Sequence, residues 1–122
     1  MQHTPGFLKL VNAAKSRIQE TDIAGYLAMR AASTPHLLID TREESEFAAG
    51  HAVGALHLSK GIIERDIETK VPDKSAKLVL YCGGGFRSAL VADNLQQMGY
   101  TDVISLDGGW KAIAASGIPT GT

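Results

Sequence analysis

Four short apolar segments recur along the chain, and stretches with helical spacing separate them. The four segments are HLLID (36–40), GALHL (54–58), KLVLYC (77–82) and DVISL (102–106). Segments of this length that are apolar almost throughout are typical of strands buried on both faces of a sheet. Strands that alternate with helices form a parallel sheet with helices on both faces, so the pattern predicts an α/β domain of three layers.

The stretches between these segments carry helical signals. We predict helices over 7–18, from 21 or 22 to the break at 33–35, and over 42–50, 60–70, 87–99 and 107–117. Thr21 or Asp22 is placed to cap the second helix and Asp107 the last, since their side chains accept hydrogen bonds from the free amides of a first turn. Gly50, Gly99 and Gly117 close three of these segments, as glycine commonly does at helix ends.

The length of 122 residues suits one domain with a hydrophobic core. We assign residues 1–20 to an N-terminal helical extension packed on the domain, and residues 21–122 to the domain itself. With a net charge of −1 and 20% charged residues, the chain lacks the basic character that nucleic-acid binding requires. No apolar run approaches the roughly 20 residues that span a bilayer, so we expect no membrane partner.

Cysteine and histidine usage bears on compartment and on metals. One cysteine makes no internal disulfide, and the N-terminal segment lacks the apolar stretch and cleavage site of a secretory signal, so we expect a reducing cytoplasm. The four histidines show no paired spacing typical of metal ligands, and one cysteine supplies no thiolate cluster. We therefore expect neither a metal nor a cofactor.

The single cysteine, Cys82, stands between a predicted strand and a predicted helix and is followed by three glycines. In parallel sheets, binding sites lie beyond the carboxyl ends of the strands, which is where Cys82 falls. The residues Gly83, Gly84 and Gly85 permit positive φ angles and let successive backbone amides curl around one point. Together with the free amides of the helix start, the loop is predicted to form a cup that binds an anion.

A thiol at the rim of such a cup ionises more readily, because the amides stabilise the negative charge of a thiolate. Cys82 is then a nucleophile. The structural alternative is that Cys82 is a small buried hydrophobe and the glycines are only a turn. The succession of strand end, triple glycine and helix start favours the nucleophile. Arg87 either reinforces the positive field or braces the loop by pairing with a carboxylate.

These residues resemble the rhodanese-like sulfurtransferases in single-domain form, over about 23–119. Residues 82–88, Cys-Gly-Gly-Gly-Phe-Arg-Ser, are similar to the active-site loop of that family. The stretch LLIDTREESEFAAGHAVGAL (37–56) is similar to its first signature, and MGYTDVISLDGGWKAIAASGIP (98–119) to its second. Two positions depart from the family: Val53 stands where many relatives have proline, and Gly83 where many thiosulfate-using relatives have a charged residue. The second departure weakens the case for thiosulfate as the physiological donor.

The resemblance implies a rhodanese-type fold and a two-step sulfur transfer. Cys82 takes the outer sulfur of a donor such as thiosulfate, becomes a persulfide, and passes that sulfur to cyanide or a thiol. The loop residues after Cys82 would bind the substrate anion; they are Gly83, Gly84, Gly85, Phe86, Arg87 and Ser88. The partners implied are a small sulfur donor and acceptor, or a protein that gives or receives sulfur.

Two other functions remain as alternatives. Related cysteine phosphatases and arsenate reductases have five residues between cysteine and arginine, whereas four lie between Cys82 and Arg87, so the smaller cup favours a sulfur atom. A non-catalytic binding or sulfur-relay module, which takes sulfur from a protein partner, has the same expected fold.

Three further residues are candidates for supporting roles. Asp40 and Arg42 follow a predicted strand and either line the pocket or brace neighbouring loops, and we favour bracing because buried polar groups are normally paired. His51 is able to transfer a proton near neutral pH, although a hydrogen bond to a loop carbonyl is the simpler interpretation.

Overall fold

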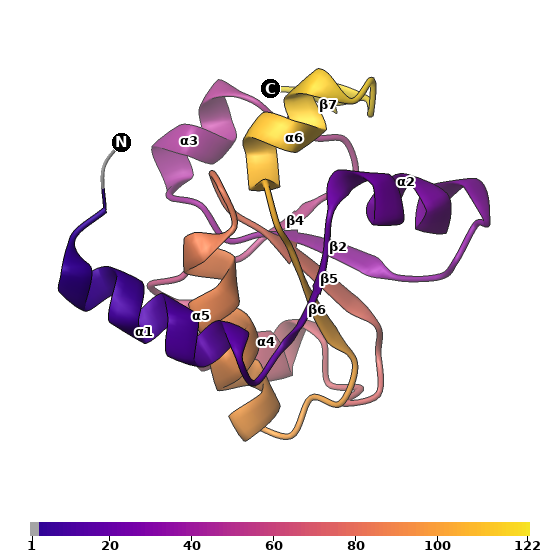
Figure 1. The fold of residues 1–122 in the computed structure, drawn as a ribbon. Coiled ribbons are helices and arrows are strands. Elements are labelled where there is room, and N and C mark those ends of the chain that lie inside the picture. Colours follow the sequence, from indigo (N-terminus) through magenta and orange to yellow (C-terminus); the bar gives the residue numbers. More distant parts are fainter. Residues whose placement is uncertain (1–2) are drawn as a thin grey trace.

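The computed structural model describes residues 3–122 and contains a central sheet of five parallel strands (Figure 1). In spatial order these are β1 (Gln19–Thr21), β6 (Val103–Leu106), β5 (Leu78–Tyr81), β2 (Leu37–Asp40) and β4 (Leu56–His57). Two short strands, β3 (His51–Ala52) and β7 (Thr120–Gly121), form a separate antiparallel pair. The predicted parallel sheet flanked by helices is confirmed.

The position of β5 at the centre of the sheet explains why its sequence is apolar throughout. All four of its residues are fully buried. Leu78 and Leu80 belong to the core on one face of the sheet, and Val79 and Tyr81 to the core on the other. A strand covered on both faces has no solvent-facing side, so the alternation of apolar and polar residues disappears.

Three helices lie on one face of the sheet: α1 (Pro5–Lys15), α4 (Ile63–Lys70) and α5 (Phe86–Gln97) (Figure 1). The helices α4 and α5 contribute Ile63, Ile67, Val91 and Leu95 to the core with Leu80 of the sheet. Helix α1 packs against α5 through its two buried residues. The elements of this face therefore place the N-terminal helix beside the helix that follows Cys82.

The opposite face is covered by α2 (Ile23–Ala31) and α6 (Gly109–Ala115), whose Tyr26 and Ile113 are fully buried against the sheet. The short helix α3 (Glu44–Ala49) follows β2 and contacts β3. Helices on both faces complete the expected three layers.

Element ends follow local capping, with one correction. Asp22 caps α2 as predicted, since its carboxylate accepts a 2.8 Å hydrogen bond from the Gly25 amide. The predicted cap of α6 by Asp107 is wrong: Gly108 occupies that position with φ +90°, and the Asp107 carboxylate lies 3.6 Å from Lys15 Nζ. Strands β1, β3 and β7 are not predicted from the sequence, because strands of two or three residues outside an apolar run show no measurable period.

The expected division of the chain at residue 20 stays a prediction. Strand β1 lies across that boundary and pairs with β6 at the edge of the sheet. Residues 1 and 2 of the expected extension lie outside the described residues. Within 3–122, no helix has the length and apolar character needed to cross a membrane.

Candidate active site

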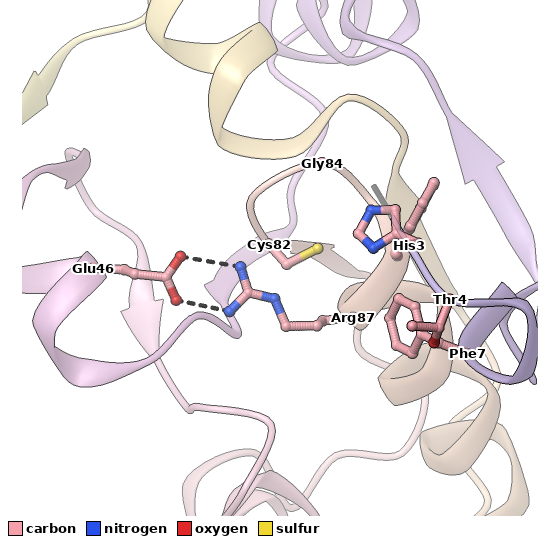
Figure 2. Close-up of a pocket in the computed structure, with 8 residues that line it drawn as sticks. His3, Thr4, Phe7, Glu46, Cys82, Gly84 and Arg87 are labelled. Carbon is pink, nitrogen blue, oxygen red and sulfur yellow. Dashed lines mark hydrogen bonds and ion pairs between the residues drawn. The ribbon is translucent and has the colours of Figure 1, made fainter. Parts of the chain in front are cut away.

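Cys82 directly follows β5, and three glycines separate it from the first residue of α5. Its side chain lines a cavity of about 630 Å³ at the carboxyl end of the sheet (Figure 2). The residue is 1% exposed. The thiol was expected at the rim of the loop, but it lies deeper, so a reagent reaches the sulfur through the cavity.

The sulfur of Cys82 has hydrogen-bond partners from the loop and the helix start. The Gly85 amide donates to Sγ at 3.1 Å, and the thiol donates to Ser88 Oγ at 3.6 Å. Burial by itself raises the pKa of Cys82, but hydrogen bonds to the sulfur from Ser88, Gly85 and Gly84 outweigh it, so the pKa lies below its ordinary value. The arrangement favours a thiolate.

Ser88 itself is held by a second buried hydroxyl. Its Oγ lies 2.9 Å from Ser105 Oγ of β6, and both serines are fully buried. When Cys82 is a thiolate, Ser88 donates to the sulfur and accepts from Ser105. Ser105 is not recognisable from the sequence, because its contact with Ser88 depends on the packing of α5 against β6.

Helix α6 turns the carbonyl side of the loop away from the sulfur. The amides of Trp110, Lys111 and Gly108 donate to the carbonyl oxygens of residues 82, 83 and 84, at 2.7, 3.3 and 3.3 Å. Gly109 makes this approach possible, because a Cβ there would overlap the carbonyl oxygen of Cys82. The Gly-Gly-Trp segment thus has a structural role: it fixes the loop carbonyls so that amides face the sulfur.

Only one of the three loop glycines requires glycine for its conformation. Gly85 has φ +102°, in the left-handed region that favours glycine. Gly84 does not have a positive φ, and a Cβ there meets no atom within 4 Å. Of the three residues that permit a positive φ angle, Gly85 alone adopts one.

Arg87 is both a cavity residue and a brace for the loop. Its guanidinium donates two hydrogen bonds to Glu46 of α3, at 2.7 and 3.0 Å (Figure 2). The hydrogen bond from Arg87 is the largest cause that lowers the pKa of Glu46, to about 2. The two side chains therefore remain an ion pair at neutral pH, and the positive charge of Arg87 is largely compensated.

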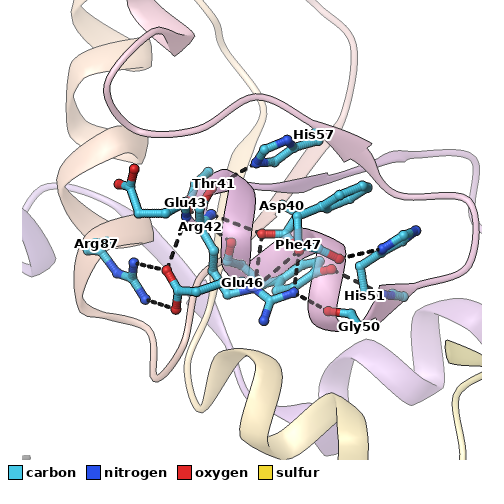
Figure 3. A network of polar contacts seen from close by, with 12 residues as sticks. Asp40, Thr41, Arg42, Glu43, Glu46, Phe47, Gly50, His51, His57 and Arg87 are labelled. Carbon is cyan, nitrogen blue, oxygen red and sulfur yellow. Dashed lines mark hydrogen bonds and ion pairs between the residues drawn. The ribbon is translucent and has the colours of Figure 1, made fainter. Parts of the chain in front are cut away.

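Asp40, Arg42 and His51 belong to a neighbouring polar network rather than to the cavity lining (Figure 3). Arg42 is 3% exposed, donates to both carboxylate oxygens of Asp40 at 2.8 and 3.1 Å, and donates to the carbonyl oxygen of Gly50. His51 Nδ1 lies 2.9 Å from the carbonyl oxygen of Phe47. These contacts join the end of β2 to α3, which carries Glu46.

The N-terminal segment lines the cavity, a contact that the sequence does not predict. His3, Thr4 and Phe7 lie on the side of Cys82 opposite the Glu46–Arg87 pair (Figure 2). Phe7 is the first residue of the helix predicted over 7–18, and no local pattern indicates where such a helix docks. Within 3–122, no group of three or more His, Cys, Asp or Glu side chains is placed to hold a metal ion.

Comparison with known proteins identifies relatives of the chain. A family model for the rhodanese-like domain matches residues 23–116. Thiosulfate sulfurtransferase PspE of Escherichia coli is 36% identical over 76 residues, which cover 62% of this chain and 72% of PspE. Thiosulfate sulfurtransferase GlpE of Coxiella burnetii is 34% identical over 79 residues, with the same two coverages.

Solved structures show the same fold. A protein of unknown function from Rhodopseudomonas palustris, described as a possible tyrosine phosphatase, superimposes with a TM-score of 0.80 at 27% identity and covers 98% of this chain and 96% of its own. A rhodanese from E. coli solved with anions is 31% identical, with a TM-score of 0.63, and covers 71% of this chain and 98% of its own.

Proposed function

This chain belongs to the rhodanese-like domain family, and we propose that it is a sulfurtransferase that carries a sulfane sulfur on Cys82. The observation that carries the proposal is the environment of the sulfur. The sulfur lines a cavity and accepts a hydrogen bond from the Gly85 amide, and the pKa of Cys82 lies below its ordinary value. The names of the relatives PspE and GlpE, both thiosulfate sulfurtransferases, support the same reaction class.

In the proposed first step, the Cys82 thiolate attacks the outer sulfur of thiosulfate. The S–S bond of the donor breaks, its electron pair leaves with sulfite, and the outer sulfur stays on Cys82 as a persulfide anion. No general base is required, because the nucleophile is already a thiolate and sulfite leaves as an anion. The loop amides stabilise negative charge on sulfur as it develops.

In the proposed second step, cyanide or a thiolate attacks the outer sulfur of the persulfide. The bond between the two sulfurs breaks, the acceptor keeps the outer sulfur, and the Cys82 thiolate is restored. Arg87 has a positioning role, since its ion pair with Glu46 fixes the start of α5, which follows the loop, relative to α3.

Intact-mass measurement after mixing with thiosulfate tests the proposal. We expect a gain of about 32 Da that is absent from Cys82→Ala and that disappears when cyanide is added. Parallel samples receive mercaptopyruvate and glutathione persulfide. If none of the three donors leaves a sulfur on Cys82, the enzyme proposal is wrong and a binding or relay module is favoured instead.

The likeness to a possible tyrosine phosphatase calls for a second measurement. Four residues separate Cys82 from Arg87, and the guanidinium is engaged by Glu46, so the loop offers a small cup for one sulfur atom. We expect no hydrolysis of para-nitrophenyl phosphate above that of Cys82→Ala. If the protein hydrolyses para-nitrophenyl phosphate in a way that depends on Cys82, and no sulfur adduct forms on Cys82, the proposed sulfurtransferase function is wrong and a phosphatase is favoured instead.

A further inference from the structure

Helix α1 is fixed beside the active-site loop by contacts along its length. Val11 and Ala14 are each 1% exposed and lie on the face that packs against α5. Just beyond the helix, Arg17 donates two hydrogen bonds to Asp93 of α5, at 3.0 and 2.7 Å. These contacts orient the first turn of α1 and the residues before it toward the cavity above Cys82.

Three aromatic side chains that line this cavity lie close to one another, and we call them the aromatic wall: His3, Phe7 and Phe86. The ring of His3 lies 4.4 Å from that of Phe86 and 5.3 Å from that of Phe7, centroid to centroid, in tilted arrangements. The two phenylalanine rings are 6.3 Å apart. Two of the three residues precede residue 23, where the match to the rhodanese-like family begins.

The charge of the cavity argues for a singly charged ligand. Arg87 is the one arginine or lysine in the lining formed by residues 3–122, and Glu46 compensates it. Lys15, which lies 5.3 Å from the centre of the Phe86 ring, is paired with Glu20 and Asp107. The loop amides compensate the negative charge of the Cys82 thiolate itself, so a donor with two negative charges, such as thiosulfate, is repelled more strongly here than a donor with one.

The size of the cavity argues for an organic ligand. Its volume of about 630 Å³ falls within the range of roughly 300–1,000 Å³ that is typical of small-molecule sites. An inorganic ion of a few atoms fills only the part next to Cys82. The remainder is bounded by the aromatic wall, which presents apolar ring surface.

We propose that the aromatic wall is the subsite for the organic group of a monoanionic sulfane-sulfur donor, R–SO₂–S⁻ or R–S–S⁻, in which R is aromatic or otherwise apolar. This inference rests on the proposed sulfurtransferase function. With a thiosulfonate, the Cys82 thiolate attacks the outer sulfur, the S–S bond breaks, and the electron pair leaves on the sulfinate R–SO₂⁻. Cys82 keeps the outer sulfur as a persulfide, and no proton or outside electron is needed.

Two donors that differ only in R provide the test: benzenethiosulfonate and methanethiosulfonate. The measured quantity is the ratio of their kcat/KM values, with cyanide as acceptor, in the wild type and in two variants of α1. Phe7→Ala removes one ring of the wall. Leu10→Ala is the matched control, because Leu10 is on the same helix, is 63% exposed, and is not among the cavity-lining residues.

We expect the benzene-to-methane ratio to fall about tenfold in Phe7→Ala, which is the effect of losing a contact between aromatic rings. In Leu10→Ala the ratio should stay within about twofold of the wild type, and Phe7→Leu should recover part of the loss because it restores apolar contact. A ratio that is the same in Phe7→Ala and Leu10→Ala overturns the proposal, provided that both donors leave a sulfur on Cys82.

A binding measurement separates failure of the subsite from failure of the proposed function. Benzenesulfonate and methanesulfonate carry one negative charge and no sulfane sulfur, so they occupy the site without reacting. We expect benzenesulfonate to protect Cys82 from iodoacetamide at lower concentration than methanesulfonate, and Phe7→Ala to remove the difference. Equal protection by the two sulfonates in the wild type contradicts the subsite whether or not sulfur is transferred.

Discussion

The backbone amide of Trp110 donates a 2.7 Å hydrogen bond to the carbonyl oxygen of Cys82, which joins the start of α6 to the residue that carries the thiol. Two weaker contacts from the same turn hold the next two loop carbonyls. A peptide unit has its carbonyl and its amide on opposite sides, so fixing the carbonyls outward helps to turn the amides toward Sγ. Helix α6 therefore contributes to the anion cup without touching the sulfur.

Gly109→Ala should lower both stability and thiol reactivity, because its Cβ would overlap the Cys82 carbonyl oxygen. Gly117→Ala is the control: Gly117 also has a positive φ, +87°, but no atom lies within 4 Å of a Cβ there. Both variants place alanine at a positive φ angle, and this backbone strain costs each of them roughly 1–2 kcal/mol. We expect Gly109→Ala to cost at least about 2 kcal/mol more in urea unfolding. Equal losses of unfolding free energy in the two variants would show that the approach of residue 109 to the Cys82 carbonyl oxygen leaves room for a Cβ.

Ser88→Ala should raise the pKa of Cys82, because it removes a hydroxyl that stabilises the thiolate. The rate of alkylation by iodoacetamide, followed against pH, has its midpoint at this pKa. We expect a wild-type midpoint below the ordinary thiol value of about 8.5 and a shift to higher pH in the variant. Ser116→Ala is the control, since Ser116 donates to Ile113 in α6 and does not contact the sulfur.

The same lowered pKa links Cys82 to stability. The folded thiol loses its proton at lower pH than the unfolded one, so the thiolate stabilises the folded state at pH above the unfolded pKa. That contribution is lost as the pH falls through the folded pKa. Ser88→Ala should bring the folded pKa of Cys82 closer to its unfolded pKa, and so narrow the pH window between the two pKa values over which this contribution changes. If the stability difference between wild type and Cys82→Ala does not change with pH across the window, the thiolate is not stabilised by folding.

The sequence predicts the segment from β5 to α5 well, because its signals are local. An apolar run, a cysteine, three glycines and a helical period follow one another without a gap, and the structure has a strand, a loop and a helix there. Asp22 likewise caps α2 through a contact within four residues. Features set by neighbouring residues in the chain are those that pattern and propensity capture.

Features that depend on distant contacts could not be predicted in the same way. The role of Gly109 depends on α6 reaching the loop after β5, and the choice between two roles for Arg87 depends on Glu46, 41 residues earlier. His3 and Phe7 reach the cavity because α1 docks on α5. In each case the sequence contains the residue but not the packing that directs its side chain.

Asp40→Asn should destabilise the fold strongly, because it leaves the buried guanidinium of Arg42 without its counter-ion. Removing one partner of a buried ion pair costs about 3–5 kcal/mol. Asp66→Asn is the control, since Asp66 pairs with Arg65 at the exposed surface and its loss should have a far smaller effect. The free energy of unfolding in urea is the measurement. Comparable losses of stability in the two variants would mean that the Asp40–Arg42 pair does not brace the fold.

Glu46→Gln should weaken the fold at neutral pH and much less in acid. Arg87 holds the pKa of Glu46 near 2, below the ordinary glutamate value of about 4.3, so the stabilising charge is fully present above the ordinary value. It is lost as the pH falls toward 2. The stability difference between wild type and Glu46→Gln should therefore be constant from pH 7 to about 5 and shrink below that. Glu44→Gln, an exposed change on the same helix, should not reproduce this profile.

The same variant tests the charge argument for the cavity. Glu46→Gln removes the negative charge that compensates Arg87, so the cavity gains one uncompensated positive charge next to the loop. A dianion profits from that charge more than a monoanion does, because the Coulomb energy scales with the ligand charge. The ratio of kcat/KM for thiosulfate over methanethiosulfonate should rise in Glu46→Gln, even if both values fall because the loop is less well braced. The rise should weaken at high salt, since the charges border an open cavity. An unchanged ratio at low salt would mean that the Glu46–Arg87 pair does not set the preferred charge of the donor.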